Sequence, residues 1–277
     1  MPEIPPFLDA RTPPEPDRTG WILDQYKELV AAIRFLSTIP IPGSAQLFRT
    51  DTGDARLFLG SAYFPLVGLL LSALLYACVW IFGSLVSPLV LAALLVVLLV
   101  LLTGGLHLDG LMDSCDGLFG GRSPERKLEI MRDSRVGSFG VLGGICILLL
   151  KFALLASLNL QLIPLALLTI LPISRWTMVQ AMYAFPSARA TGLGAAFRQT
   201  VTRDRLICAA VLTLIIAWFA SHLVGLILWF CATLISWLIG RWITSALGGL
   251  TGDSYGTLAE VMEVVLLLLF TLLRFWF

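Results

Sequence analysis

The sequence predicts an all-α fold, a polytopic integral membrane bundle of about seven transmembrane helices with an N-terminal amphipathic helix. Of the 277 residues, 58% are hydrophobic and 13% are charged, whereas about a quarter of a soluble domain is charged. Residues 57–108 contain no Asp, Glu, Lys or Arg. Because one span needs about 20 apolar residues, this segment is long enough for two. The composition excludes a soluble globular enzyme, a disordered chain and a nucleic-acid binder.

The N-terminal region divides into two parts. Residues 1–20 contain six prolines among polar residues, a composition typical of a disordered tail rather than of a signal peptide. Residues 21–39 place apolar side chains near one face of a helix and charged ones on the rest. This pattern predicts an amphipathic helix that lies on the membrane surface or covers the bundle. Pro40 and Pro42 end it.

Seven apolar segments are the expected spans. The fifth is short, so six spans plus a re-entrant helix is the alternative. The segments cover residues 58–82, 88–106, 139–158, 162–184, 206–221, 224–243 and 258–276.

The basic residues predict how the bundle is oriented. They gather before the first span and in the loops after the second and fourth spans, whereas the opposite loops have none. By the positive-inside rule, the N-terminus and the large loops face the cytosol. The acidic residues lie on the same side. The five cysteines include no CxxC pair and are expected to be unpaired.

An acidic segment follows the second span. Asp109, Asp113 and Asp116 are spaced four and three residues apart, so a helix would place all three carboxylates on one face. Neighbouring carboxylates repel each other, and a cation relieves that repulsion. Hard oxygen ligands suit Mg²⁺ or Mn²⁺, and Mg²⁺ also takes ligands from water and phosphate. We therefore expect metal–phosphate chemistry here, with Asp133 as a candidate fourth carboxylate.

Other polar residues surround this segment. Ser123 and Pro124 are typical of the N-cap and first residue of a short helix. Arg132 and Arg135 follow it and are candidates to hold phosphate oxygens or to balance the carboxylates. His107, two residues before the first aspartate, is a candidate general base, phosphate donor or metal ligand.

A second acidic element lies at the last span. Asp253, Glu260 and Glu263 again share a helical face, and isolated carboxylates inside an apolar helix favour a function. We expect the two acidic faces to converge on one site. Lys151 and Arg175 are basic residues well inside their spans, and Arg175 is expected in a deep polar cavity.

The chain resembles the cobalamin synthase (adenosylcobinamide-GDP ribazoletransferase) family. The resemblance rests on five blocks in order, with FLSTIP (35–40) similar to the family's opening segment. The blocks are TGGLHLDGLMDSCDG (103–117), EIMRDSRVG (129–137), PISRW (172–176), GLG (192–194) and GLTGD (249–253). Met112 and Cys115 depart from the smaller residues expected there, and neither is a carboxylate.

The resemblance implies a Mg²⁺-dependent transfer at the cytosolic face of the bacterial inner membrane, within a single catalytic domain, residues 21–277. Adenosylcobinamide-GDP is the implied donor, and α-ribazole or its 5′-phosphate the acceptor. The products are adenosylcobalamin, or its 5′-phosphate, and GMP. A homo-oligomer, or contact with other enzymes of B12 assembly, stays open.

Each candidate residue then has an expected role. His107 or Asp253 orients or deprotonates the attacking hydroxyl. The other candidates bind metal or substrate. Metal ligands are Asp109, Asp113, Asp116 and Asp133, and substrate or phosphate contacts are Arg132, Arg135, Arg175, Arg189, Glu260 and Glu263.

Two rival functions remain open. A CDP-alcohol phosphatidyltransferase has a similar acidic motif, but that family expects Ala-Arg soon after the Asp-Gly, and here Asp109-Gly110 is followed by Leu111-Met112-Asp113. A divalent-cation transporter would use the acidic faces for transport. The absence of acidic residues at mid-span argues against it.

Overall fold

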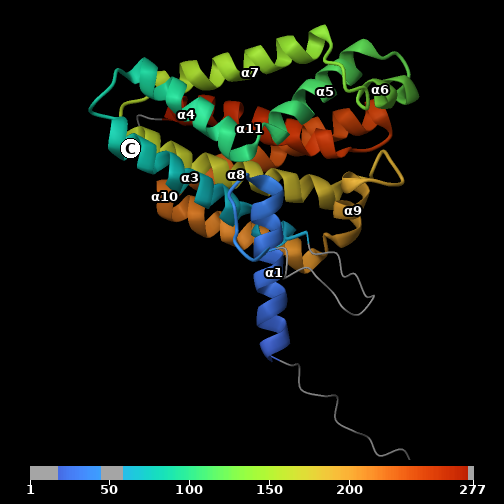
Figure 1. Ribbon diagram of the computed structural model, residues 1–277, viewed down its shortest axis with the longest axis horizontal. Coiled ribbons are helices and arrows are strands. Elements are labelled where there is room, and N and C mark those ends of the chain that lie inside the picture. Colours follow the sequence, from blue (N-terminus) through green and yellow to red (C-terminus); the bar gives the residue numbers. More distant parts are fainter. Residues whose placement is uncertain (1–17, 45–58, 274–277) are drawn as a thin grey trace, which may run out of the picture.

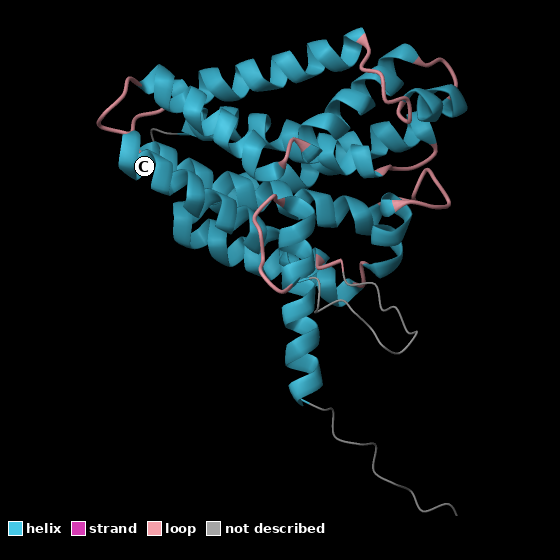
Figure 2. Ribbon diagram, in the orientation of Figure 1, coloured by secondary structure: helices cyan, strands magenta, loops and turns pink. Residues whose placement is uncertain are grey.

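The computed structural model describes residues 18–44 and 59–273, and this part of the chain is helical without β-strands. Its elements form a bundle whose long helices run side by side (Figures 1 and 2). They are α1 (Arg18–Leu36), η1 (Ser61–Tyr63), α3 (Phe64–Phe82), α4 (Pro88–Thr103), α5 (Leu106–Gly120), α6 (Pro124–Ile130), α7 (Ser138–Ala156), α8 (Leu162–Ala184), α9 (Leu193–Thr200), α10 (Arg203–Leu247) and α11 (Gly252–Leu273).

The helices confirm the predicted multi-pass membrane bundle. Within the described residues, five segments are long and apolar enough to span a membrane, and the bent pair α4 and α5 raises the number to six. The fourth predicted span, 162–184, coincides with α8. This helix is the most buried of the candidate spans and packs against α3, α10 and α11. The bundle core therefore surrounds α8.

Helix α10 is interrupted where the sequence predicts the boundary between the fifth and sixth spans. Ser221 and His222 have non-helical backbone angles. A Cβ on Gly225 would lie 2.1 Å from the carbonyl oxygen of Ala217. In a continuous helix, eight residues rise about 12 Å, so these two residues could not touch. The chain therefore doubles back into two arms, one for the fifth and one for the sixth predicted span.

Because the two arms touch at Gly225, we expect Gly225→Val to lower the free energy of unfolding by roughly 1–3 kcal/mol. Unfolding in detergent, followed by circular dichroism, measures the change. Gly120→Ala is the control, because its new Cβ would meet its neighbours at an ordinary 3.8 Å. Equal stabilities for wild type and Gly225→Val would show that the arms do not touch.

The N-terminal helix is displaced from its predicted range. Helix α1 covers 18–36 rather than 21–39, so its first residues fall inside the predicted tail; residues 1–17 of that tail lie outside the described part. The chain leaves the helix at Leu36 because Thr38 donates its backbone N–H to the carbonyl of Leu102, at 2.7 Å. Figure 1 shows α1 lying across the bundle and projecting from it.

The second predicted span, 88–106, ends earlier than expected. Gly104 and Gly105 both have positive φ angles, 63° and 70°, which glycine adopts at little cost. They end α4 and turn the chain by 89° into α5. The acidic segment is therefore a helix rather than a loop.

The last predicted span, 258–276, begins earlier than expected. Helix α11 begins at Gly252, six residues before the predicted start at residue 258. Residues 274–276 of that predicted span lie outside the described part.

Candidate functional site

Helices α5 and α11 cross in close contact at two glycines. A Cβ on Gly110 would lie 2.9 Å from the carbonyl oxygen of Asp253, and one on Gly256 would lie 3.0 Å from that of His107. The hydroxyl of Thr257 donates to the carbonyl of Gly110, at 3.2 Å. This contact brings the acidic residues of α5 beside the first turn of α11, as the sequence predicts for Asp253.

An acidic cluster forms at this crossing, and we use that name for Asp109, Asp113 and Asp253. The negative charges of Asp109, Asp253 and Asp116 all act on Asp113, and Arg189 opposes them. Asp109 is exposed, whereas Asp113 and Asp253 are half-buried. Like charges this close repel each other, so a bound cation stabilises the ionised cluster.

Two loops pair to place Arg189 at the cluster. The backbone N–H of Ala188 donates to Leu250 at 2.9 Å, and that of Leu250 donates to Pro186 at 2.8 Å. Arg189 then lies with one guanidinium nitrogen 3.8 Å from a carboxylate oxygen of Asp253. The loops after α8 and α10 therefore place a cation beside the acidic cluster.

Asp116 lies on the same helix but has backbone partners. Its carboxylate is buried and accepts hydrogen bonds from the backbone N–H groups of Gly137, at 2.7 Å, and Gly140, at 2.8 Å. An anion at the start of a helix stabilises it. Asp116 thus fixes the start of α7, and its predicted role as a metal ligand stays a prediction.

The remaining loop residues are exposed. Ser123 caps α6 as predicted, accepting from Arg126 at 3.3 Å. The helix ends at Ile130, so Arg132 and Asp133 follow it. Hydrogen bonds from the side chain and backbone of Arg135 hold the pKa of Asp133 at about 2, below its ordinary value. Asp133 is thus paired with Arg135, and both predicted ligand roles remain predictions.

The acidic cluster has donor atoms that suit a hard cation. Within the described residues, no three His, Cys, Asp or Glu side chains are gathered so that they could hold one metal ion. Mg²⁺, however, is usually bound by one or two carboxylates, with water and substrate phosphates completing its shell. The cluster therefore suits Mg²⁺ that arrives with a phosphate substrate.

Two cavities meet at Gly252 and Asp253, which line both. The first, which we call the apolar cavity, has a volume of about 90 Å³. The second, the polar cavity, has about 200 Å³. The other lining residues of the apolar cavity are Phe35, Leu106, His107, Asp109, Gly110, Met178, Phe197, Tyr255 and Gly256. Those of the polar cavity are Ser187, Arg189, Thr191, Gly192, Gly194, Ala195 and Thr251.

His107 lines the apolar cavity from the first turn of α5. Its side chain is 1% exposed, and both ring nitrogens lack a hydrogen-bond partner in the described part of the chain. The charges of Arg175, Glu263 and Lys151 all act on it. His107 therefore lies between the acidic cluster and a second group of charges deeper in the bundle.

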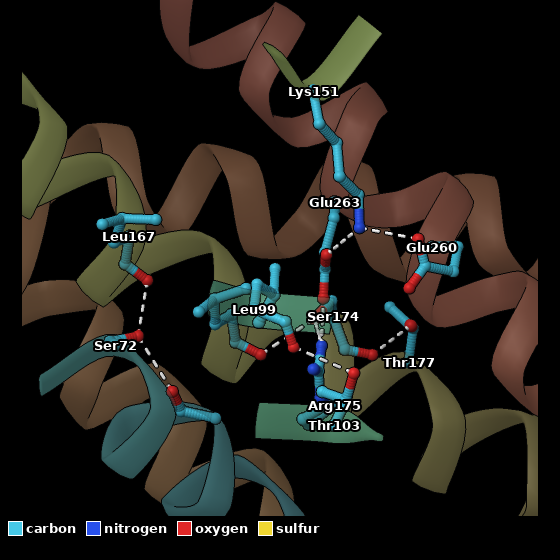
Figure 3. A network of polar contacts seen from close by, with 12 residues as sticks. Ser72, Leu99, Thr103, Lys151, Leu167, Ser174, Arg175, Thr177, Glu260 and Glu263 are labelled. Carbon is cyan, nitrogen blue, oxygen red and sulfur yellow. Dashed lines mark hydrogen bonds and ion pairs between the residues drawn. The ribbon is translucent and has the colours of Figure 1, made fainter. Parts of the chain in front are cut away.

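These deeper charges form a buried ion network, which we define as Lys151, Arg175, Glu260 and Glu263 (Figure 3). The ammonium of Lys151 contacts Glu260, at 2.6 Å, and Glu263. The guanidinium of Arg175 contacts Glu263 and the hydroxyl of Ser174. Two cations and two anions balance, which is how charges persist inside a membrane bundle.

The network explains several residues expected to bind substrate. Arg175 is completely buried, and Glu260 and Glu263 face Lys151 rather than the acidic cluster. The structure thus brings Asp253 to the cluster but not the two glutamates. Substrate binding by Arg175, Glu260 and Glu263 stays a prediction.

Sequence reasoning missed Tyr255. Its hydroxyl is buried without a hydrogen-bond partner among the described residues, and its side chain lines the apolar cavity. One signal was present: a polar hydroxyl two residues after Asp253, at the start of an apolar helix.

The helices, the cluster and the two cavities define a multi-pass membrane protein with a polar site at one end of its bundle. Figure 1 shows α5, α6 and α9 at the end opposite the one marked C. The chain belongs to the cobalamin-5-phosphate synthase family, whose model matches residues 28–271. This membership confirms the resemblance that the sequence blocks carry.

Curated relatives match over nearly their whole length. A protein of Desulfitobacterium hafniense is 40% identical over 247 residues, which cover 87% of this chain and 95% of the relative. One of Roseiflexus sp. is 41% identical over 242 residues, with 87% and 88% covered. One of Desulforamulus reducens is 38% identical over 248 residues, with 89% and 97% covered. All three are named adenosylcobinamide-GDP ribazoletransferase. No solved structure matches the chain.

Proposed function

We propose that this protein is an adenosylcobinamide-GDP ribazoletransferase. The observation that carries the proposal is the match to relatives of that name along almost the whole chain. The site supports it, because a polar cavity with Arg189 adjoins a cluster of carboxylates and a second, apolar cavity. A donor with a pyrophosphate and an acceptor with a free hydroxyl need two such adjoining spaces.

The reaction assigns tasks to the described residues. The acceptor ribose hydroxyl attacks the phosphorus that carries the corrinoid, a new P–O bond forms, and the bond to GMP breaks. Arg189 binds phosphate oxygens in the polar cavity. Asp253, which lines both cavities, orients the hydroxyl, and either Asp253 or His107 accepts its proton. Such a transfer depends mainly on positioning and charge stabilisation.

Mg²⁺ is part of this proposal. Asp109 and Asp113 would hold it, with water and substrate phosphate completing its shell. When bound, Mg²⁺ supplies positive charge to the pyrophosphate and to the departing GMP. The positive-inside pattern supports the further proposal that the site faces the cytosol at the bacterial inner membrane, where a nucleotide-linked donor is available.

Release of GMP tests the proposal directly. Purified protein in detergent, given adenosylcobinamide-GDP and Mg²⁺, is expected to release GMP only when α-ribazole or its 5′-phosphate is present. A corrinoid product should form in equal amount, and EDTA should stop both. Folded protein that releases no GMP under these conditions would overturn the proposal. Turnover of a CDP-alcohol, or Mg²⁺ flux into proteoliposomes without nucleotide, would then support one of the two rival functions.

A further inference from the structure

The apolar cavity differs in chemistry from the polar cavity beside it. Its walls include the aromatic side chains of Phe35 and Phe197 and the thioether of Met178. The two phenylalanine rings lie 4.6 Å apart, centroid to centroid. Few polar side chains line it, and Asp109 and Asp253 are the charged ones. A space of this kind suits a planar ring with few hydrogen-bonding atoms.

Two buried polar side chains of this cavity have no partner. Tyr255 and His107 are each 1% exposed, and neither the hydroxyl nor the ring nitrogens make a hydrogen bond to the described residues. Buried polar groups are nearly always hydrogen-bonded, so each exception needs an explanation. A bound ligand that carries an acceptor atom would explain the exception, because it would accept the missing hydrogen bond.

The size of the cavity limits the ligand. About 90 Å³ holds several water molecules, which is far too little for a corrin. Guanine has several donors and acceptors that the apolar walls would leave unpaired, whereas the benzimidazole of α-ribazole has one unsubstituted ring nitrogen, an acceptor. The single hydroxyl of Tyr255 matches that one acceptor.

We propose that the apolar cavity is the acceptor subsite, in which the benzimidazole of α-ribazole lies against Phe35, Phe197 and Met178 while Tyr255 donates a hydrogen bond to its ring nitrogen. This assignment rests on the proposed function. The ribose then points toward Asp253, at the wall shared with the polar cavity. Tyr255 is thus a specificity-determining residue that no step of the chemistry requires.

Tyr255→Phe tests the assignment, because it removes only the hydroxyl. We expect the KM for α-ribazole to rise about tenfold, the effect of one hydrogen bond of about 1.4 kcal/mol. The KM for adenosylcobinamide-GDP and the thermal stability should not change. Calorimetry with α-ribazole alone should show the same loss of affinity. Tyr76→Phe, at an exposed position on α3, is the matched control.

An acceptor analogue makes the test specific. An indole riboside replaces the ring nitrogen of the base by CH, and wild type should bind it about tenfold more weakly than α-ribazole. Tyr255→Phe should bind both equally. A raised KM for the donor instead, or equal discrimination in both proteins, would overturn the assignment. If calorimetry shows the expected pattern while no GMP is released, the proposed function fails, and the apolar cavity remains a binding site for the benzimidazole alone.

Discussion

Asp113→Asn is expected to lower the rate of GMP release by about a hundredfold or more, since even residues that only support metal ligands contribute 10–100-fold. Asp113 lies at the centre of the acidic cluster, where the charges of Asp109, Asp253 and Asp116 act on it. An amide keeps the shape of the side chain and removes its charge, so cation binding weakens while α5 stays intact. Initial rates over a Mg²⁺ titration measure the loss.

Two features of that titration separate a metal role from a general loss of charge. The Mg²⁺ concentration for half-maximal rate should rise in Asp113→Asn. Glu125→Gln, which removes an exposed carboxylate from the first turn of α6, should leave both the rate and the Mg²⁺ requirement as in wild type. An Asp113→Asn protein with more than a tenth of the wild-type rate would contradict the proposed metal site.

Glu263→Ala is expected to lower the free energy of unfolding by about 3–5 kcal/mol, the cost of breaking a buried ion pair on one side. Glu263 contacts both Lys151 and Arg175. Its removal leaves these two buried cations with Glu260 as the one remaining anion of the network. Equilibrium unfolding in mixed detergent micelles, compared with wild type, measures the change.

Two further variants show whether charge balance is the cause. The double variant Lys151→Met, Glu260→Gln removes one cation and one anion and keeps the pair between Arg175 and Glu263. It should lower the free energy of unfolding by less than half as much as Glu263→Ala does. Glu129→Ala breaks the exposed ion pair with Arg126. It should lower the free energy of unfolding by at most about 1 kcal/mol. A Glu263→Ala protein as stable as Glu129→Ala would refute the network's structural role.

The spans were predictable because lipid imposes a simple rule. A helix in hydrocarbon needs an unbroken apolar run, and residues 162–184 and the interruption at 221–224 follow directly from that requirement. The bend at Gly104 and Gly105 was not predictable in the same way. Glycine permits a turn without demanding one, so an apolar run that continues through it looks like a longer span.

The pairing of charges was harder to predict than their presence. The sequence indicates that Lys151, Arg175, Glu260 and Glu263 are unusual, but the partners Lys151 and Glu260 are 109 residues apart. Their contact depends on the depth of each residue in the bundle and on which helix faces lie together. For Asp253 this information was available, because its position at the end of a loop placed it with the other carboxylates that the sequence predicts to face the cytosol.

Helix α4 has 16 residues, so at 1.5 Å per residue it is about 24 Å long, shorter than a hydrocarbon layer of about 30 Å. Such a mismatch is met by local thinning of the bilayer. A bilayer that α4 crosses alone would hold the turn into α5 below the level of the surrounding headgroups unless the lipids there are compressed. We therefore expect the rate of GMP release to fall as the acyl chains lengthen, because a thicker bilayer would draw the carboxylates of α5 toward hydrocarbon.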